Sequence, residues 1–128
     1  MPADYIALTE LSRLERMNML ERGEFKKYYT LVTDVIRRYL EARFNVDAID
    51  RTTSELLGEL EDRRCRVEKL DGLLNEADLV KFARFKPAEA TGKAAMSTAR
   101  EIVVKTKPAP VAAAQDTETR AAGGGGNR

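Results

Sequence analysis

The chain has 128 residues, about the length of one domain, and is long enough to bury a modest core. Lysine and arginine number 22 against 21 acidic residues, and this balance argues against a dedicated nucleic-acid-binding protein, which normally carries a basic excess. Histidine is absent and Cys65 is the single cysteine, which excludes an internal disulfide and zinc sites built on paired cysteines and favours a reducing cytosol.

The first predicted helix covers residues 4–22. Asp4 suits the N-cap position, and Gly23 is a natural C-terminal stop. Apolar residues recur at every third position, which drifts around a helix and predicts a broad apolar face. These residues are Tyr5, Leu8, Leu11, Leu14, Met17 and Leu20.

The second predicted helix, residues 24–44, carries the longest helical hydrophobic pattern in the chain. Its apolar residues follow one another at steps of three, four or one, so they form a single stripe. They are Phe25, Tyr28, Tyr29, Val32, Val35, Ile36, Tyr39, Leu40 and Phe44. Most are aromatic or β-branched, so local helix propensity is weak and the helix is stable only if other segments cover the stripe. Asn45, which tolerates a left-handed conformation, is placed to end it.

Three shorter patterns predict helices over residues 53–62, 67–85 and 88–105. Thr52 and Glu55 form a capping-box pattern at the start of the first of these helices. The last is rich in alanine, and its small residues permit a neighbouring backbone to approach closely.

Beyond residue 106 the composition changes to alanine, proline and glycine, which predicts a disordered tail over residues 107–128. The sequence therefore predicts an all-α fold, a compact bundle of about five helices that occupies residues 1–106. No stretch approaches the eighteen or so apolar residues that a membrane span needs, so we expect this segment to be soluble.

The residue types that carry catalysis are scarce. The absence of histidine removes the commonest general base and transition-metal ligand, and the only glycine cluster, residues 123–126, has no helix after it that would make a phosphate loop. No acidic residues lie on the apolar stripes, where a carboxylate metal site inside a bundle requires them. We therefore expect no enzymatic activity, no cofactor and no metal. An enzyme that uses Asp78 with Lys81 or Cys65 is kept only as a remote third hypothesis.

Two basic pairs, Lys26 with Lys27 and Arg37 with Arg38, lie on the second predicted helix. They are either a binding patch for phosphate, anionic lipid or an acidic partner, or a solvated helix flank, which is the interpretation we favour. The tyrosines of the same helix are interpreted as core residues whose hydroxyl groups reach the edge, rather than as stacking platforms for bases. Cys65, which is flanked by arginines, is interpreted as an inert thiol because no second cysteine is present to resolve it.

The segment of residues 77–87 combines charged side chains with two aromatic ones at one helix end. The residues concerned are Asp78, Lys81, Phe82, Arg84, Phe85 and Lys86. Two interpretations stand side by side: the aromatic and cationic groups are exposed and dock a partner, or Phe82 and Phe85 plug the base of the bundle while Asp78 pairs with Lys81. Together with Lys26, Lys27, Arg37 and Arg38, these six residues are the candidate interaction surface.

Two blocks, GEFKKYYTLVTDVIRRYLEARFNVDAIDRTTSELLGEL and LLNEADLVKFARFKP, resemble the cytosolic C-terminal region of BatD-like bacterial membrane proteins, named after aerotolerance genes in Bacteroides. The match spans about residues 20–105. The residues that carry it are Tyr29, Arg37, Arg38, Tyr39, Leu40, Arg43, Phe44, Arg51, Thr52, Thr53, Glu55, Leu56, Ala77, Asp78, Lys81, Phe82 and Pro87.

The resemblance implies a membrane-tethered helical module at the cytoplasmic face of the bacterial inner membrane. In that family an extracytoplasmic β-rich region and a membrane span precede the module, so the resemblance implies a segment cut from a longer protein. It also implies partners, a MoxR-type AAA+ ATPase or proteins with von Willebrand factor A domains, and offers no catalytic residues. The leading hypothesis is a non-enzymatic protein-interaction domain; the alternative is a nucleic-acid or anionic-lipid-binding module that uses the basic flank of the central helix.

Overall fold

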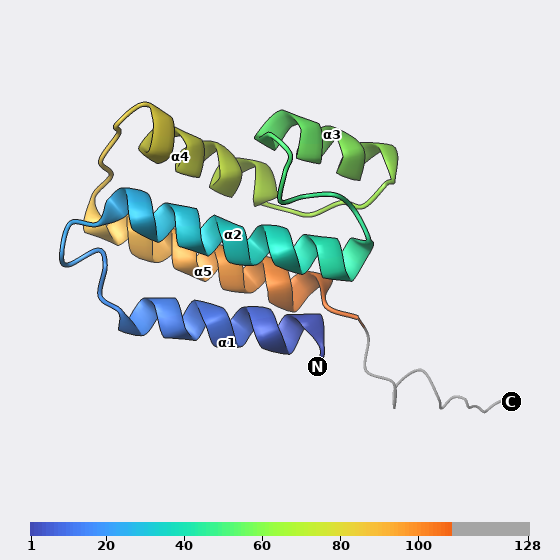
Figure 1. Cartoon of the computed structure of the whole chain (residues 1–128), viewed down its shortest axis with the longest axis horizontal. Coiled ribbons are helices and arrows are strands. Elements are labelled where there is room, and N and C mark those ends of the chain that lie inside the picture. Colours follow the sequence, from blue (N-terminus) through green and yellow to red (C-terminus); the bar gives the residue numbers. More distant parts are fainter. Residues whose placement is uncertain (109–128) are drawn as a thin grey trace, which may run out of the picture.

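The computed structural model describes residues 1–108, which form five helices and no strand (Figure 1). In chain order these are α1 (Ala3–Arg16), α2 (Phe25–Phe44), α3 (Thr53–Asp62), α4 (Leu70–Phe82) and α5 (Glu89–Thr106). The predicted all-α bundle is confirmed. The predicted disordered tail lies, from residue 109 onward, outside the described residues.

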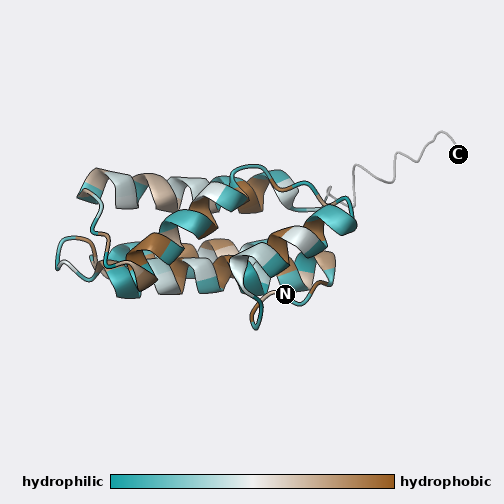
Figure 2. Ribbon diagram, turned by 90° about the horizontal axis from the view of Figure 1, so that it is seen from above, coloured by the Kyte–Doolittle hydropathy of each residue, from teal (hydrophilic) through white to brown (hydrophobic). Residues whose placement is uncertain are grey.

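Helix α2 lies at the centre of the bundle and contacts α1, α4 and α5, while α3 packs on α4. Helices α1 and α4 run antiparallel to α2, and α5 runs parallel to it (Figure 1). Seen from above, each helix shows apolar segments next to hydrophilic ones, as amphipathic helices do (Figure 2). This arrangement brings the start of α2, the end of α4 and the start of α5 to one end of the molecule (Figure 1).

The apolar stripe of α2 is covered by its neighbours, as predicted from its composition. Tyr29, Val32, Ile36 and Leu40 are completely buried, and only the two terminal phenylalanines of the stripe are half-buried. The α5 face that packs in the core consists of Gly92, Ala95, Met96, Ala99, Ile102 and Val103. Burial of the α2 stripe against its neighbours supplies favourable free energy that offsets the weak helix propensity of α2.

Three tyrosines of α2 anchor the neighbouring helices through their hydroxyl groups. Tyr28 donates to the carbonyl of Gly92 at 2.7 Å, Tyr29 donates to the carboxylate of Glu76, and Tyr39 is 2.9 Å from the hydroxyl of Thr106. All three rings are at most 3% exposed. The interpretation of these tyrosines as core residues is confirmed, and none is available to stack on a base.

Gly92 allows α5 to pack closely against the side chain of Leu20. A Cβ atom at this position would lie 2.7 Å from Cδ2 of Leu20, so a larger residue would force that side chain to move. The small residues predicted on one face of this helix therefore allow a close contact. At the same position, the Tyr28 hydroxyl donates to the Gly92 carbonyl.

The first helix is shorter than the predicted 4–22 and ends at Arg16. Residues 17–23 form turns instead. Asn18 adopts the left-handed conformation with a φ of 55°, and asparagine accepts this more readily than most residues, so the helix ends before the expected stop at Gly23. The amide of Glu24 then donates to the carbonyl of Met19 at 2.9 Å and closes the turn before α2.

The fourth helix is also shorter than the predicted 67–85, because left-handed residues flank it. Lys69 has a φ of 70° just before its start, and Arg84 has a φ of 56° just after its end. The amides of Ala83 and Phe85 both donate to the carbonyl of Leu79, which fixes the chain reversal at this end. Other predicted ends are confirmed: Asn45 is left-handed at the end of α2, and Thr52 and Glu55 form the capping box of α3.

Candidate interaction surface

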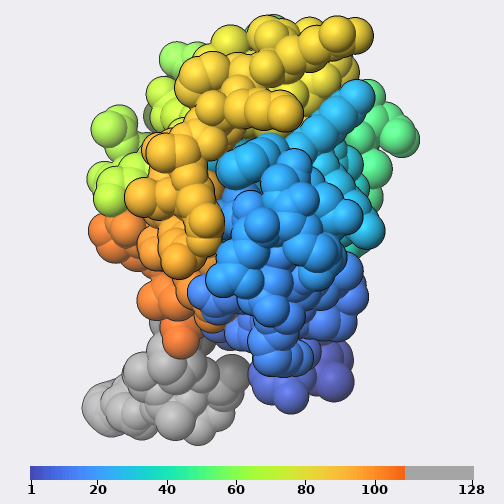
Figure 3. Space-filling model, turned by 90° about the vertical axis from the view of Figure 1, so that its left-hand side faces the viewer, coloured from blue at the N-terminus to red at the C-terminus, as the bar shows by residue number. Residues whose placement is uncertain are grey.

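The end of α4 and the start of α2 enclose a groove of about 550 Å³. It is lined on one side by residues 23–27 and on the other by Val80, Lys81, Phe82, Arg84, Phe85 and Lys86. We call this surface the basic–aromatic groove. Figure 3 views this end of the molecule, where the yellow atoms that follow α4 adjoin the blue atoms of the start of α2.

Two of the three phenylalanines that line the groove are open to solvent. Phe82 is 78% exposed and Phe85 is 47% exposed, so neither plugs the base of the bundle. Helix α4 ends at Phe82, and Arg84 adopts the left-handed conformation just after it, so Phe85 does not continue the helix. The exposure that the first interpretation of this segment requires is thus observed, while docking of a partner stays a prediction. Phe25, which was placed in the core stripe, lines the groove as a half-buried residue.

Five cationic side chains surround the groove: Lys26, Lys27, Lys81, Arg84 and Lys86. Within residues 1–108, none of them forms an ion pair, whereas Lys93, Arg100 and Lys105 on α5 all do. The ammonium of Lys81 instead lies 5.7 Å from the centre of the Phe82 ring, within range of a cation–π contact. The groove therefore carries a concentrated positive charge in a chain that is nearly neutral overall.

Two acidic residues of α4, Glu76 and Asp78, form hydrogen bonds away from the groove. Asp78 accepts a hydrogen bond from the hydroxyl of Thr53 at 2.7 Å, and Glu76 accepts one from Tyr29. The expected pairing of Asp78 with Lys81 is not among the ion pairs of the described residues, so Asp78 supports the contact of α3 with α4 and does not neutralise the groove.

The two basic pairs of α2 do not form one surface. Arg37 is 8% exposed, and its Nη1 donates to the carbonyls of Ala48 and Arg51 at 2.7 Å each. Its assignment to the interaction surface was wrong, because the loop after α2 folds over it and uses the guanidinium as an internal donor. Arg38 is exposed but lies about 16 Å along the helix from Lys27, at a rise of about 1.5 Å per residue.

The start of α2 also differs from every other helix start in the described residues. Helices α1, α3, α4 and α5 each carry an acidic residue in the first turn, whereas α2 carries none. Lys26 and Lys27 occupy that turn instead, next to the positive end of the helix dipole. This placement lowers the stability of the helix. It also adds the positive potential of the helix N-terminus to the charges of the two lysines.

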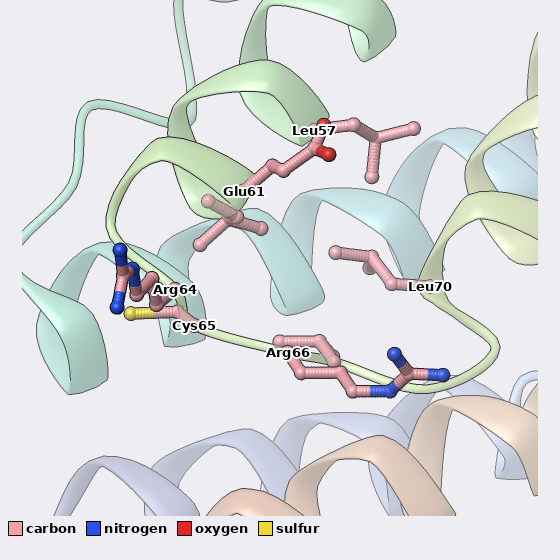
Figure 4. A pocket seen from close by; sticks show the side chains of 8 residues that line it. Leu57, Glu61, Arg64, Cys65, Arg66 and Leu70 are labelled. Atoms are coloured by element: carbon pink, nitrogen blue, oxygen red, sulfur yellow. The ribbon is translucent and has the colours of Figure 1, made fainter.

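A second hollow, of about 430 Å³, lies between α3 and the start of α4 (Figure 4). Leu57 and Leu70 line it, while the sulfur of Cys65 points away from them, beside Arg64 (Figure 4). The thiol of Cys65 is 3.7 Å from the carbonyl of Arg63. Glu61, Arg64 and Arg66 also line the hollow, and no ion pair joins them within residues 1–108.

Among residues 1–108, no group of three or more histidine, cysteine, aspartate or glutamate side chains is placed to hold a metal ion. In that part of the chain, none of the helices combines the length and the apolar character of a membrane span. The largest concentration of exposed aromatic and cationic side chains that we find in these residues is the basic–aromatic groove. Comparison of the chain with protein-family models, curated proteins and solved structures found no match.

Proposed function

We propose that this chain is a non-enzymatic protein-interaction domain that binds its partner through the basic–aromatic groove. The observation that carries the proposal is the exposure of Phe82 and Phe85 beside five cations without ion pairs in the described residues. Phenylalanine and arginine are enriched in protein interfaces, so Phe82, Phe85 and Arg84 suit the centre of such a contact, while the four lysines suit its polar rim.

The resemblance to the cytosolic region of BatD-like proteins supplies the partner classes of the proposal. These are a MoxR-type AAA+ ATPase and proteins with von Willebrand factor A domains. On the same basis, we propose that the domain works at the cytoplasmic face of the bacterial inner membrane as part of a membrane-anchored protein. The alternative, nucleic-acid or anionic-lipid binding along the basic flank of α2, is weakened because Arg37 is engaged inside the fold.

Photocrosslinking in the native cells tests this proposal. Phe82 is replaced by p-benzoylphenylalanine, and Tyr5, which is 56% exposed near the N-terminal end of α1, receives the same replacement as a matched control. Tyr5 belongs to the end of the bundle opposite the groove (Figure 1). We expect position 82 to form a specific covalent adduct with the ATPase or an A-domain protein. Equal adducts from both positions, or none from position 82, would contradict the proposal.

A further inference from the structure

Within residues 1–108, the cations of the basic–aromatic groove have no ion-pair partner. These cations face a single carboxylate among the lining residues, Glu24, and this is 2.9 Å from Arg22. The nearby acids of α4 are held by Thr53 and Tyr29. A binding partner is therefore needed to bring carboxylates to the groove if its charge is to be neutralised.

The two phenylalanines add a requirement for apolar contact. Phe82 and Phe85 flank a hollow, and the ring of Phe82 is already approached by Lys81 on one side. An occupant must place an apolar side chain into the hollow while its carboxylates face the surrounding ammonium and guanidinium groups. A flat anionic membrane matches the charge but does not fill the hollow. A single-stranded nucleic acid matches the charge and can stack a base on an exposed ring, but the near-neutral net charge of the chain does not favour it.

The conformation of the occupant follows from the lack of a sheet edge in the described residues. Binding of an extended peptide by strand addition requires an exposed strand, and residues 1–108 contain none. A helix satisfies its own backbone and presents side chains alone, which suits a groove between two helices. The positive end of the α2 dipole lies next to Lys26 and Lys27 and strengthens the attraction of this site for carboxylates.

We infer that the basic–aromatic groove binds an acidic amphipathic helix of a partner protein, whose apolar residues contact Phe82 and Phe85 and whose carboxylates face Lys27, Lys81 and their neighbours. This inference rests on the proposed function and names the chemistry of the partner's contact. It differs from that proposal in a testable way, because a partner of another chemistry would leave the protein-interaction function intact.

Three synthetic helical peptides of about 18 residues test the inference with the full chain. The first carries a leucine stripe flanked by glutamates, the second has lysines in place of the glutamates, and the third has alanines in place of the leucines. Fluorescence anisotropy measures each dissociation constant. We expect the first to bind about tenfold or more tightly than either of the others, and its affinity to fall severalfold between about 50 and 200 mM NaCl.

Single substitutions locate the binding. Phe82→Ala is expected to weaken the first peptide about tenfold, as is typical of a central interface residue, and Lys27→Glu severalfold. Arg38→Glu is the matched control, because Arg38 is also an exposed cation on α2 but lies outside the groove. We expect it to leave the dissociation constant unchanged. Phe85→Ala is a second aromatic variant, and circular dichroism verifies that each variant is folded.

Equal binding of the acidic and basic peptides, or no binding of the acidic peptide at about 50 mM NaCl, would overturn the inference. Tighter binding to vesicles of phosphatidylcholine and phosphatidylglycerol at about 7:3, or to a single-stranded oligonucleotide, would also overturn it in favour of those ligands. If photocrosslinking from position 82 captures a protein while the peptides fail, the proposed function stands and this inference falls. If the acidic peptide binds while photocrosslinking from position 82 captures no protein, the proposed function is overturned.

Discussion

The two ends of α2 carry similar residues and use them differently. At the C-terminal end, Arg37 donates to two carbonyls of the following loop, Arg43 donates to the carbonyl of Thr106 at 2.6 Å, and Glu41 accepts from the loop amides. At the N-terminal end, Lys26 and Lys27 form no ion pair within the described residues and border exposed phenylalanines.

The difference shows that the surroundings of a charged residue, rather than its type, decide its role. A basic residue stabilises the fold where the chain turns back over the helix and offers carbonyl acceptors, as residues 45–52 do after α2. It stays available at the groove, where Lys26 and Lys27 form no ion pair within residues 1–108.

Arg37→Ala is expected to lower the free energy of unfolding by about 3 kcal/mol, because two carbonyls lose a charged donor at an 8% exposed site. The adjacent Arg38→Ala is expected to change it by less than about 0.5 kcal/mol, as for most exposed residues. Urea unfolding of the two variants measures the difference. Similar losses would mean that the loop contact of Arg37 contributes little.

Alkaline pH tests the buried face at the N-terminal end of α2. Burial raises the pKa of Tyr28 to about 12 from an ordinary value of 10.0. The folded protein thus holds this proton more tightly than the unfolded chain, so its contribution to stability is complete below pH 10 and is lost as pH rises towards 12. The expected loss is about 2–3 kcal/mol, at about 1.4 kcal/mol per pKa unit.

Tyr28→Phe provides the comparison for this pH effect, because it removes the titrating group. The difference in unfolding free energy between wild type and Tyr28→Phe should shrink, then reverse, across the same pH interval, measured by urea unfolding at fixed temperature. A difference that stays constant from pH 9 to 12 would contradict the role given to the buried hydroxyl and its 2.7 Å bond to Gly92.

A smaller effect is expected at Glu41, on the C-terminal end. The amides of Ile49 and Ala48 donate to its carboxylate and hold the pKa of Glu41 below its ordinary value of 4.5. Its contribution to stability is therefore present above pH 4.5 and is lost as pH falls through the lowered pKa. Glu41→Gln should be less stable than wild type at neutral pH and should approach it in acid. Glu21→Gln, at an exposed site in the turn before α2, serves as the control.

The smallest expected effect has the opposite sign. Lys27→Glu places a negative charge in the first turn of α2, where the helix dipole favours it, and should raise the melting temperature by an amount equivalent to about 0.3–1 kcal/mol. The same variant is expected to bind the acidic peptide less tightly. A loss of stability would show that Lys27 supports the fold.

Much of the fold is predictable from the sequence, because period and caps are local properties. The stripe of α2, the small face of α5 and the capping box at Thr52 are all found as predicted. The ends of α1 and α4 are not predictable in the same way. Asn18, Lys69 and Arg84 adopt left-handed conformations. Lysine and arginine, unlike asparagine, give no general indication in a sequence that a helix ends there.

The candidate surface is predictable in its parts but not in its assembly. The segment that ends α4 stands out in the sequence by its composition, and Lys26 and Lys27 are visible as a pair. Their meeting across one groove depends on the antiparallel packing of α4 on α2, which no local pattern gives. For the same reason, the sequence cannot separate Arg37 from Arg38, because only the loop that folds over Arg37 makes it internal.

Unfolding of Phe82→Ala, with and without the acidic peptide, tests the division between fold and binding most directly. Because Phe82 is 78% exposed, the variant should unfold within about 0.5 kcal/mol of wild type when no peptide is present. Excess peptide should stabilise wild type, by about 2.7 kcal/mol at a hundredfold excess over the dissociation constant, and should stabilise the variant far less. A large intrinsic loss of stability in Phe82→Ala, or an equal stabilisation of both proteins by the peptide, would contradict the account.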